Sequence, residues 1–210
     1  MPGFAAPLIP SIYQLRAVLR GVSPLVWRRL LVSADSTIAD LHATLQIAFG
    51  WDDAHLHRFL IHGSAYGLAY SGGLSFRDDA RRVPLSRFSF RPTERFVYDY
   101  DFNDGWRLDL RVEEVLAPEP ARTYPMCTGG RRAGPPEGCG GPSAFLEQRR
   151  RHSVVAAAAR LAEVLDGPDW REENHDELFE QLNWLRLDRF DRRAVNKALA
   201  RQAMADRSVA

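Results

Sequence analysis

FVYDYDFNDGWRLDLRV, residues 96–112, is the stretch that decides the fold. Apolar residues fall at every second position before its turn, and the same spacing returns after the turn. This is the pattern of two half-buried strands joined as a hairpin. A two-residue turn would point one apolar set at water, so the register favours the three-residue loop Asn103-Asp104-Gly105, which pairs Phe102 with Trp106.

Further elements follow on both sides of this hairpin. Thr37 and Asp40 form a capping box that opens an amphipathic helix, and Gly50 closes that helix. We expect strands at 12–19, 25–32 and 57–61, helices at 38–49, 144–150, 154–165, 176–185 and 192–203, and mostly loop at 63–95, with one short strand there. Proline, glycine and both cysteines concentrate in residues 117–143, which predicts an ordered loop or a linker rather than a helix or central strand.

The order of these elements predicts an α+β fold, with a mostly antiparallel sheet of about five strands packed on one long helix and finished by C-terminal helices. We divide the chain into a core domain at 11–146, which contains the glycine- and proline-rich loop 117–143. A helical extension at 147–205 is expected to pack on that core.

Composition narrows the function classes. The 210 residues carry a formal net charge of +1, which gives no general attraction to nucleic acid or to an acidic membrane. Lys197 is the only lysine, so the phosphate-binding lysine loop, the Ser-x-x-Lys pair and a lysine Schiff base within the core are excluded. No window is long and apolar enough for a membrane helix, so we expect a cytoplasmic protein without a membrane partner.

Histidine and cysteine offer one group of candidate ligands. His42, on the predicted helix, and His57, in the strand that follows, could act as ligands or as a general base, although hydrogen-bonded structural histidines are the more frequent case. A zinc site could also be assembled from His55, His57, Cys127 and Cys139, because imidazole and thiolate suit that ion. The cysteines lie twelve positions apart without a close Cys-x-x-Cys pair, which favours two free thiols in a glycine-rich loop.

Carboxylates and arginines offer two alternatives. Asp99 and Asp101 share a strand face and Asp104 lies in the turn, so the three could hold Mg²⁺, although a solvated polar face is the simpler interpretation. The arginine runs at 28–29, 81–82 and 149–151 could contact phosphates, or could pair with the acidic residues.

Six segments, taken in order, carry a family resemblance. They are YQLRAVLRGVSPLVWRRLLV, IADLHATLQIAFGW, HLHRFLIHG, YDYDFNDGW, PMCTGGRRAGPPEGCGGP and FDRRAVNKALA. Together they resemble the plasmid-borne open-reading-frame-three-like family, whose members also occur as passenger proteins of insertion sequences and are sometimes labelled resolvases. The resemblance implies an α+β fold and a bacterial mobile-element setting. It implies no established activity.

The sequence departs from the family pattern at four positions. Asn103 replaces a usual glycine, Leu108 a frequent histidine, Gly134 a frequent cysteine and Gly138 a usual aspartate. The residues do not support the resolvase label. A serine recombinase needs an N-terminal nucleophilic serine, but the early serines here lie at the ends of a hairpin. A tyrosine recombinase needs a tyrosine near a C-terminal helix, but no tyrosine follows Tyr124. The departures at positions 108, 134 and 138 each remove a polar or ligand-like group.

These observations favour a non-enzymatic accessory or interaction domain whose sheet and C-terminal helices contact protein or nucleic acid. The alternative is a metal-dependent hydrolase or nuclease that uses His42, His57, Asp99, Asp101 or Asp104. We expect no resident organic cofactor, and zinc or magnesium are the ions that the candidate residues would suit.

Overall fold

The computed structural model describes residues 11–69, 75–166 and 175–209. Within them, seven strands form one antiparallel sheet in the order β4-β3-β5-β6-β1-β2-β7. The strands are β1 Ile12–Leu19, β2 Trp27–Ser33, β3 His57–Ile61, β4 Ser64–Tyr66, β5 Arg95–Tyr100, β6 Trp106–Leu116 and β7 Met126–Arg131. The helices are α1 Ile38–Phe49, α2 Gly141–Arg151, α3 Val154–Asp166, α4 His175–Arg186 and α5 Arg192–Val209, with 3-10 turns η1 Ala80–Arg82 and η2 Leu85–Phe88.

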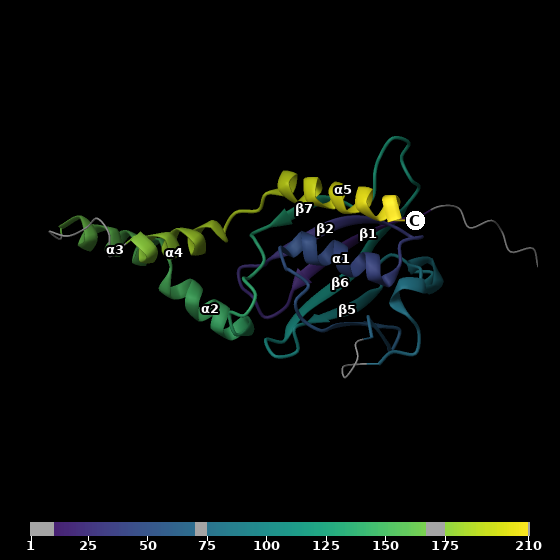
Figure 1. Cartoon of the computed structure of the whole chain (residues 1–210), viewed down its shortest axis with the longest axis horizontal. Coiled ribbons are helices and arrows are strands. Elements are labelled where there is room, and N and C mark those ends of the chain that lie inside the picture. The colour runs from purple at the N-terminus through teal and green to yellow at the C-terminus, as the bar shows by residue number, and fades with distance from the viewer. Residues whose placement is uncertain (1–10, 70–74, 167–174, 210) are drawn as a thin grey trace, which may run out of the picture.

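The architecture is α+β, as the sequence predicts. Helix α1 lies across one face of the sheet, and α5 runs beside it along the edge made by β7 (Figure 1). Helices α2, α3 and α4 extend from the other end of the sheet (Figure 1). None of the helices in the described residues is long and apolar enough to cross a membrane.

The hairpin at 96–112 has the predicted faces but a different register. Phe96 lies opposite Leu110, and Tyr100 opposite Trp106. The predicted three-residue loop is therefore wrong, and Phe102 lies outside the ladder with 41% of its surface exposed. Asp101 causes the difference, because its carboxylate accepts the backbone N–H groups of residues 103 and 104 and its carbonyl accepts that of residue 105. These bonds close a wider turn.

The predicted count of about five strands was too low. β4 is only three residues long, and β7 falls in the segment predicted as loop. Gly129 and Gly130 have no side chains, so β7 shows no alternation of apolar and polar residues from which a strand could be predicted. A Cβ at Gly130 would lie 2.4 Å from the Phe190 ring, and one at Gly129 would lie 3.3 Å from Trp27. An edge strand tolerates such glycines, and here they allow close packing.

Helix α1 has the predicted boundaries. Thr37 accepts the N–H of Asp40, the Asp40 carboxylate accepts the N–H of Thr37, and Gly50 ends the helix with φ +76°. Its last turn is fixed to the sheet by Arg28, which is 1% exposed and donates to the carbonyl of Ala48 at 2.6 Å. The Arg28 guanidinium also lies between the rings of Phe49 and Phe190.

Burial alternates along the central strands, so the sheet has two distinct faces. The face under α1 holds the core, including Leu15, Phe59, Tyr98, Leu108 and Leu110, all at most 1% exposed. The opposite face, which we call the open face, carries mainly half-buried and exposed side chains, most of them polar. The two faces therefore provide two different chemical surfaces on the same strands.

Candidate functional site

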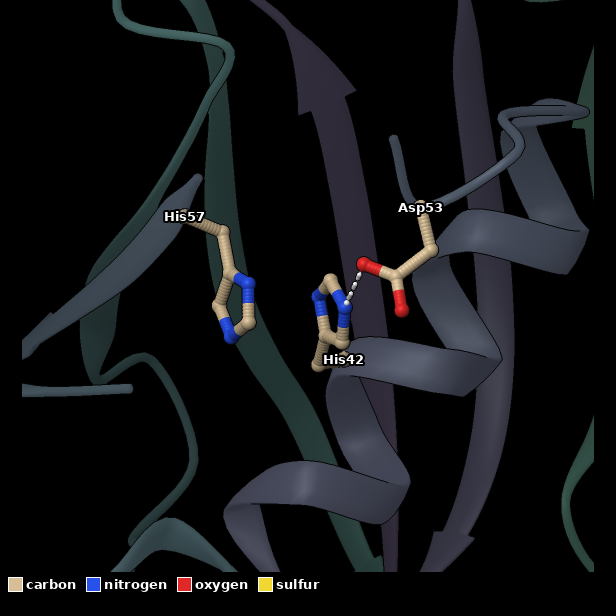
Figure 2. Close-up of side chains that lie close together, drawn as sticks. All are labelled: His42, Asp53 and His57. Atoms are coloured by element: carbon tan, nitrogen blue, oxygen red, sulfur yellow. Dashed lines mark hydrogen bonds and ion pairs between the residues drawn. The ribbon is translucent and has the colours of Figure 1, made fainter. Parts of the chain in front are cut away.

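Two histidines and an aspartate meet between α1 and the sheet (Figure 2). His42 projects from α1, His57 begins β3, and Asp53 comes from the connection between them. One ligand atom from each residue can be chosen so that all three lie within 4.8 Å of one another. We call these three residues the histidine cluster.

A hydrogen-bond network fixes His42. Its Nε2 lies 2.7 Å from Asp53 Oδ1 and its Nδ1 lies 2.8 Å from the Tyr98 hydroxyl. Gln46 completes the circuit, because its Nε2 donates to the Tyr98 hydroxyl and its Oε1 accepts the backbone N–H of Asp53. The network is satisfied when His42 is neutral, with Nε2–H donating to Asp53 and Nδ1 accepting from Tyr98.

His57 lacks such partners. It is 1% exposed, and neither of its ring nitrogens has a hydrogen-bond partner among the described residues. Its ring is stacked on that of His42, with centroids 3.5 Å apart and planes 10° apart. Burial, with a smaller contribution from His42, lowers the pKa of His57 to about 3. Burial also lowers the pKa of His42, against the opposing effect of Asp53. Both imidazoles are therefore neutral at pH 7, the form that binds metal ions.

The connection that carries Asp53 is held at two points. Trp51 Nε1 donates to the carbonyl of Pro135, and the Glu137 carboxylate accepts both the N–H of Asp52 and the hydroxyl of Tyr100. The glycine-rich loop before α2 therefore holds the connection between α1 and β3 in place by hydrogen bonds, and it contributes no residue to the histidine cluster. The side chain of Asp53 is 47% exposed, so the cluster reaches solvent through this carboxylate.

The structure brings His42 and His57 together but places the other predicted residues elsewhere. His55 Nε2 lies 3.6 Å from Asp101 Oδ2, and the Asp101 carboxylate caps the hairpin turn. Asp104 accepts the N–H of Gly140 at 3.1 Å. The predicted solvated aspartate face is wrong for two of its members, because Asp99 and Asp101 are only 6% and 3% exposed.

Asp99 is held between two arginines. Arg58 and Arg107 each donate to its carboxylate. Burial by itself would raise the pKa of Asp99, but the hydrogen bonds from Arg107 and Arg58 bring it below its ordinary value. An ion pair explains this carboxylate without a metal ion.

The two cysteines are free thiols and lie apart from the histidine cluster. Cys127 is buried in β7, where Asn196 of α5 bonds both its N–H and its carbonyl. Cys139 is half-buried in the loop before α2. Burial raises the pKa of both, that of Cys139 to about 11, so neither is a thiolate at pH 7.

Sequence reasoning missed Asp53, Tyr98 and Gln46. Asp53 is the second of two acids in WDDAHLH, and its position four residues before His57 is a usable signal. Tyr98 belongs to the alternating apolar pattern of the hairpin, which predicts core and gives no sign of a polar partner. Gln46 gave no separate signal, because its position one helical turn after His42 becomes informative only when the partner is known.

Comparison with known proteins assigns this chain to a family. Residues 11–198 match the model of the plasmid pRiA4b ORF-3-like protein family. The chain belongs to this family. Uncharacterized protein y4hQ of Sinorhizobium fredii is 30% identical over 200 residues, which cover 95% of this chain and 93% of that protein. A crystal structure of MM3350, a protein of unknown function from Methanosarcina mazei Go1, aligns with TM-score 0.65 and 27% identity over 89% of this chain and 97% of that one.

Two of the four expected departures from the family pattern can be placed in the structure. Leu108 lies directly opposite Tyr98 on the covered face. A Cβ at Gly134 would clash with the Phe49 carbonyl oxygen, so this backbone leaves no room for a side chain there. The relatives named above carry no assigned activity.

Proposed function

We propose that this plasmid ORF-3-like protein is a metal-binding accessory protein that holds one divalent ion of the zinc class with His42, His57 and Asp53. The observation that carries the proposal is His57. A buried polar ring without a hydrogen bond is unfavourable by about 1–3 kcal/mol, and its placement against a second imidazole is explained if an ion satisfies it.

The donor set selects the class of ion. Two neutral imidazoles and one carboxylate suit zinc or a neighbouring transition metal, whereas magnesium prefers oxygen ligands. Tyr98 and Gln46 act as the outer groups that orient His42 and Asp53, as partners of metal-binding histidines do in other proteins.

Binding requires local changes in all three residues. The stacked rings of His42 and His57 have nearly parallel planes, whereas two nitrogen lone pairs that converge on one ion need the rings tilted. His57 has no described hydrogen bond to break when it rotates. Asp53 would exchange its bond to His42 for the ion, and its exposed side chain can move. His42 would then bind through Nε2 as its other tautomer, with its proton on Nδ1 and donated to the Tyr98 hydroxyl.

Burial favours an accessory role over hydrolysis. His42 and His57 are 2% and 1% exposed, so an ion held by their nitrogens would face solvent on the Asp53 side alone. The ion would instead tie α1, the following connection and β3 together. We therefore propose a structural or sensing ion within an accessory protein of plasmids and insertion sequences.

Metal titration tests this proposal. Protein stripped with chelator should gain thermal stability with Zn²⁺ or Co²⁺ and little with Mg²⁺, because a ligand that binds only the folded state raises its stability. His57→Phe and Asp53→Asn should abolish the shift, while His62→Ala, at an exposed histidine beyond the other end of β3, should keep it.

His57→Phe should itself fold well, because it removes two unpaired buried nitrogens. Asp53→Asn changes a side chain that is about half exposed and provides a second test that does not touch the core. No shift with either transition metal, or an unchanged shift in both variants, would overturn the proposal.

A further inference from the structure

Four arginines form a row across the open face of the sheet. Arg95 on β5 lies directly opposite Arg111 on β6, Arg111 opposite Arg16 on β1, and Arg16 opposite Arg29 on β2. Directly paired residues share a face, so all four project from the side of the sheet away from α1. With about 4.8 Å between neighbouring strands, the row is about 14 Å long.

The charge of this row is only partly neutralised. Glu113 pairs with Arg29 at 2.5 Å and reaches Arg16 at 4.0 Å. For Arg95 and Arg111 no ion pair is found among the described residues, and both are exposed. Arg16 Nε is buried without a hydrogen-bond partner in the described part of the chain. The open face therefore has unused guanidinium donors at the centre of the sheet.

Such a row is unfavourable for folding. Like charges directly opposite each other destabilise a sheet, and here the pairing is repeated three times in succession. Several arginines elsewhere have partners or are buried. Those at 149–151 each pair with Asp188 or Glu147, and Arg28 is buried against α1. A destabilising arrangement confined to one exposed surface indicates a ligand that supplies the missing negative charge.

The surroundings of the row favour a nucleic acid. Arg16, Arg95 and Arg111 line a shallow hollow of about 280 Å³ together with Asp109, whose carboxylate pairs with Arg20. At the end of the row, the Trp27 ring lies 4.8 Å from the Arg16 guanidinium carbon. Arginines that track phosphates beside an aromatic ring that can stack a base are the features of single-strand binding surfaces. A flat sheet face offers no helix or ribbon to enter the major groove of a duplex.

We propose that the open face binds single-stranded nucleic acid, with the phosphate backbone running across β5, β6, β1 and β2 along Arg95, Arg111, Arg16 and Arg29. Trp27 would provide a stacking platform at the β2 end. This surface lies on the opposite side of the sheet from the histidine cluster, and the proposal does not depend on metal binding.

Fluorescence anisotropy with a labelled 20-nucleotide single strand at low salt tests this surface. The full-length chain should bind, and Arg95→Gln with Arg111→Gln should weaken binding at least tenfold without loss of fold, since neither side chain has an ion partner within the described ranges to leave unpaired. The slope of log affinity against log salt should fall in magnitude by about 1.4 for two lost phosphate contacts. Arg81→Gln with Arg82→Gln removes the same charge from exposed positions in η1 and should leave binding and slope unchanged.

Three results would overturn the proposal. The first is no binding at low salt. The second is an equal loss in the row and control variants, which would indicate general charge rather than a site. The third is tighter binding of a 20-base-pair duplex, or equally tight binding of polyglutamate, which would assign the surface to duplex DNA or to an acidic protein.

Discussion

The two faces of the sheet place their charged and titratable groups in opposite environments. Under α1, His42 and His57 are buried and neutral. On the open face, Arg111 and Arg95 are exposed and charged, without an ion partner in the described residues. The contrast teaches that alternation assigns a residue to a face, and the covering layer then decides its chemistry.

The largest expected effect tests how unequal the faces are in stability. Phe59 and Leu60 are neighbours in β3, but Phe59 is fully buried under α1 and Leu60 lies on the open face. Phe59→Ala should lower the free energy of unfolding by about 3–5 kcal/mol and Leu60→Ala by about 1 kcal/mol, measured by urea denaturation. Similar losses at both positions would show that the open face is covered in solution.

The next effect concerns pH and the covered face. In the metal-free protein the pKa of His57 is about 3, against 6.5 for the free side chain. Between these two pKa values the unfolded state therefore binds more protons than the folded state. The free energy of unfolding falls as the pH drops below about 6.5. Between pH 7 and pH 5 His57 should account for a loss of about 2 kcal/mol. His57→Phe should remove this part of the pH dependence, and a parallel pH profile for both proteins would contradict a buried neutral His57.

A smaller effect tests the ion pairs of the open face. Asp99 bridges Arg58 on β3 and Arg107 on β6. Asp99→Asn should lower the free energy of unfolding by about 1–2 kcal/mol. This is less than the loss of one partner of a fully buried ion pair, because both arginines are more than a third exposed and can be rehydrated. Arg58→Gln should then add little to Asp99→Asn. Full additivity in urea denaturation would mean that the three groups do not act together.

The smallest expected effect is a gain in stability. Arg111→Thr should stabilise the protein by about 0.5 kcal/mol, because it removes like-charge contacts with Arg16 and Arg95 and inserts a good strand former. Glu113→Gln should destabilise by a similar amount, since it removes the carboxylate that Arg29 and Arg16 share. Urea midpoints measured side by side would check the pair, and a destabilising Arg111→Thr would remove the argument that the row is retained for a ligand.

Much of the fold could be predicted because it follows from local rules. The capping box at Thr37 and Asp40, the glycine that ends α1 and the alternation of β1, β3 and β6 are each written in a few consecutive residues. The register of the central hairpin could not be predicted, because the bonds accepted by Asp101 close a turn that the pattern alone does not distinguish. β7 was missed because glycines carry no pattern.

The candidate site could be predicted only by half. His42 and His57 are visible as histidines on a helix and on the next strand, but their stacking depends on the angle at which α1 crosses the sheet. Asp53 joins them through a backbone with φ +57°, which nothing in its neighbours requires. The arginine row is a product of register, since its members come from four strands and are up to 95 positions apart in the chain.

By itself, the sequence determined most of the elements, the two faces of the strands, the exclusion of lysine-based chemistry and the family to which the chain belongs. Only the tertiary structure decided which histidine loses its hydrogen bonds, which arginine is buried and which arginines stand side by side. The physical reason is that periodicity and capping act over a few residues, whereas burial and charge pairing depend on groups that the chain brings together across long separations.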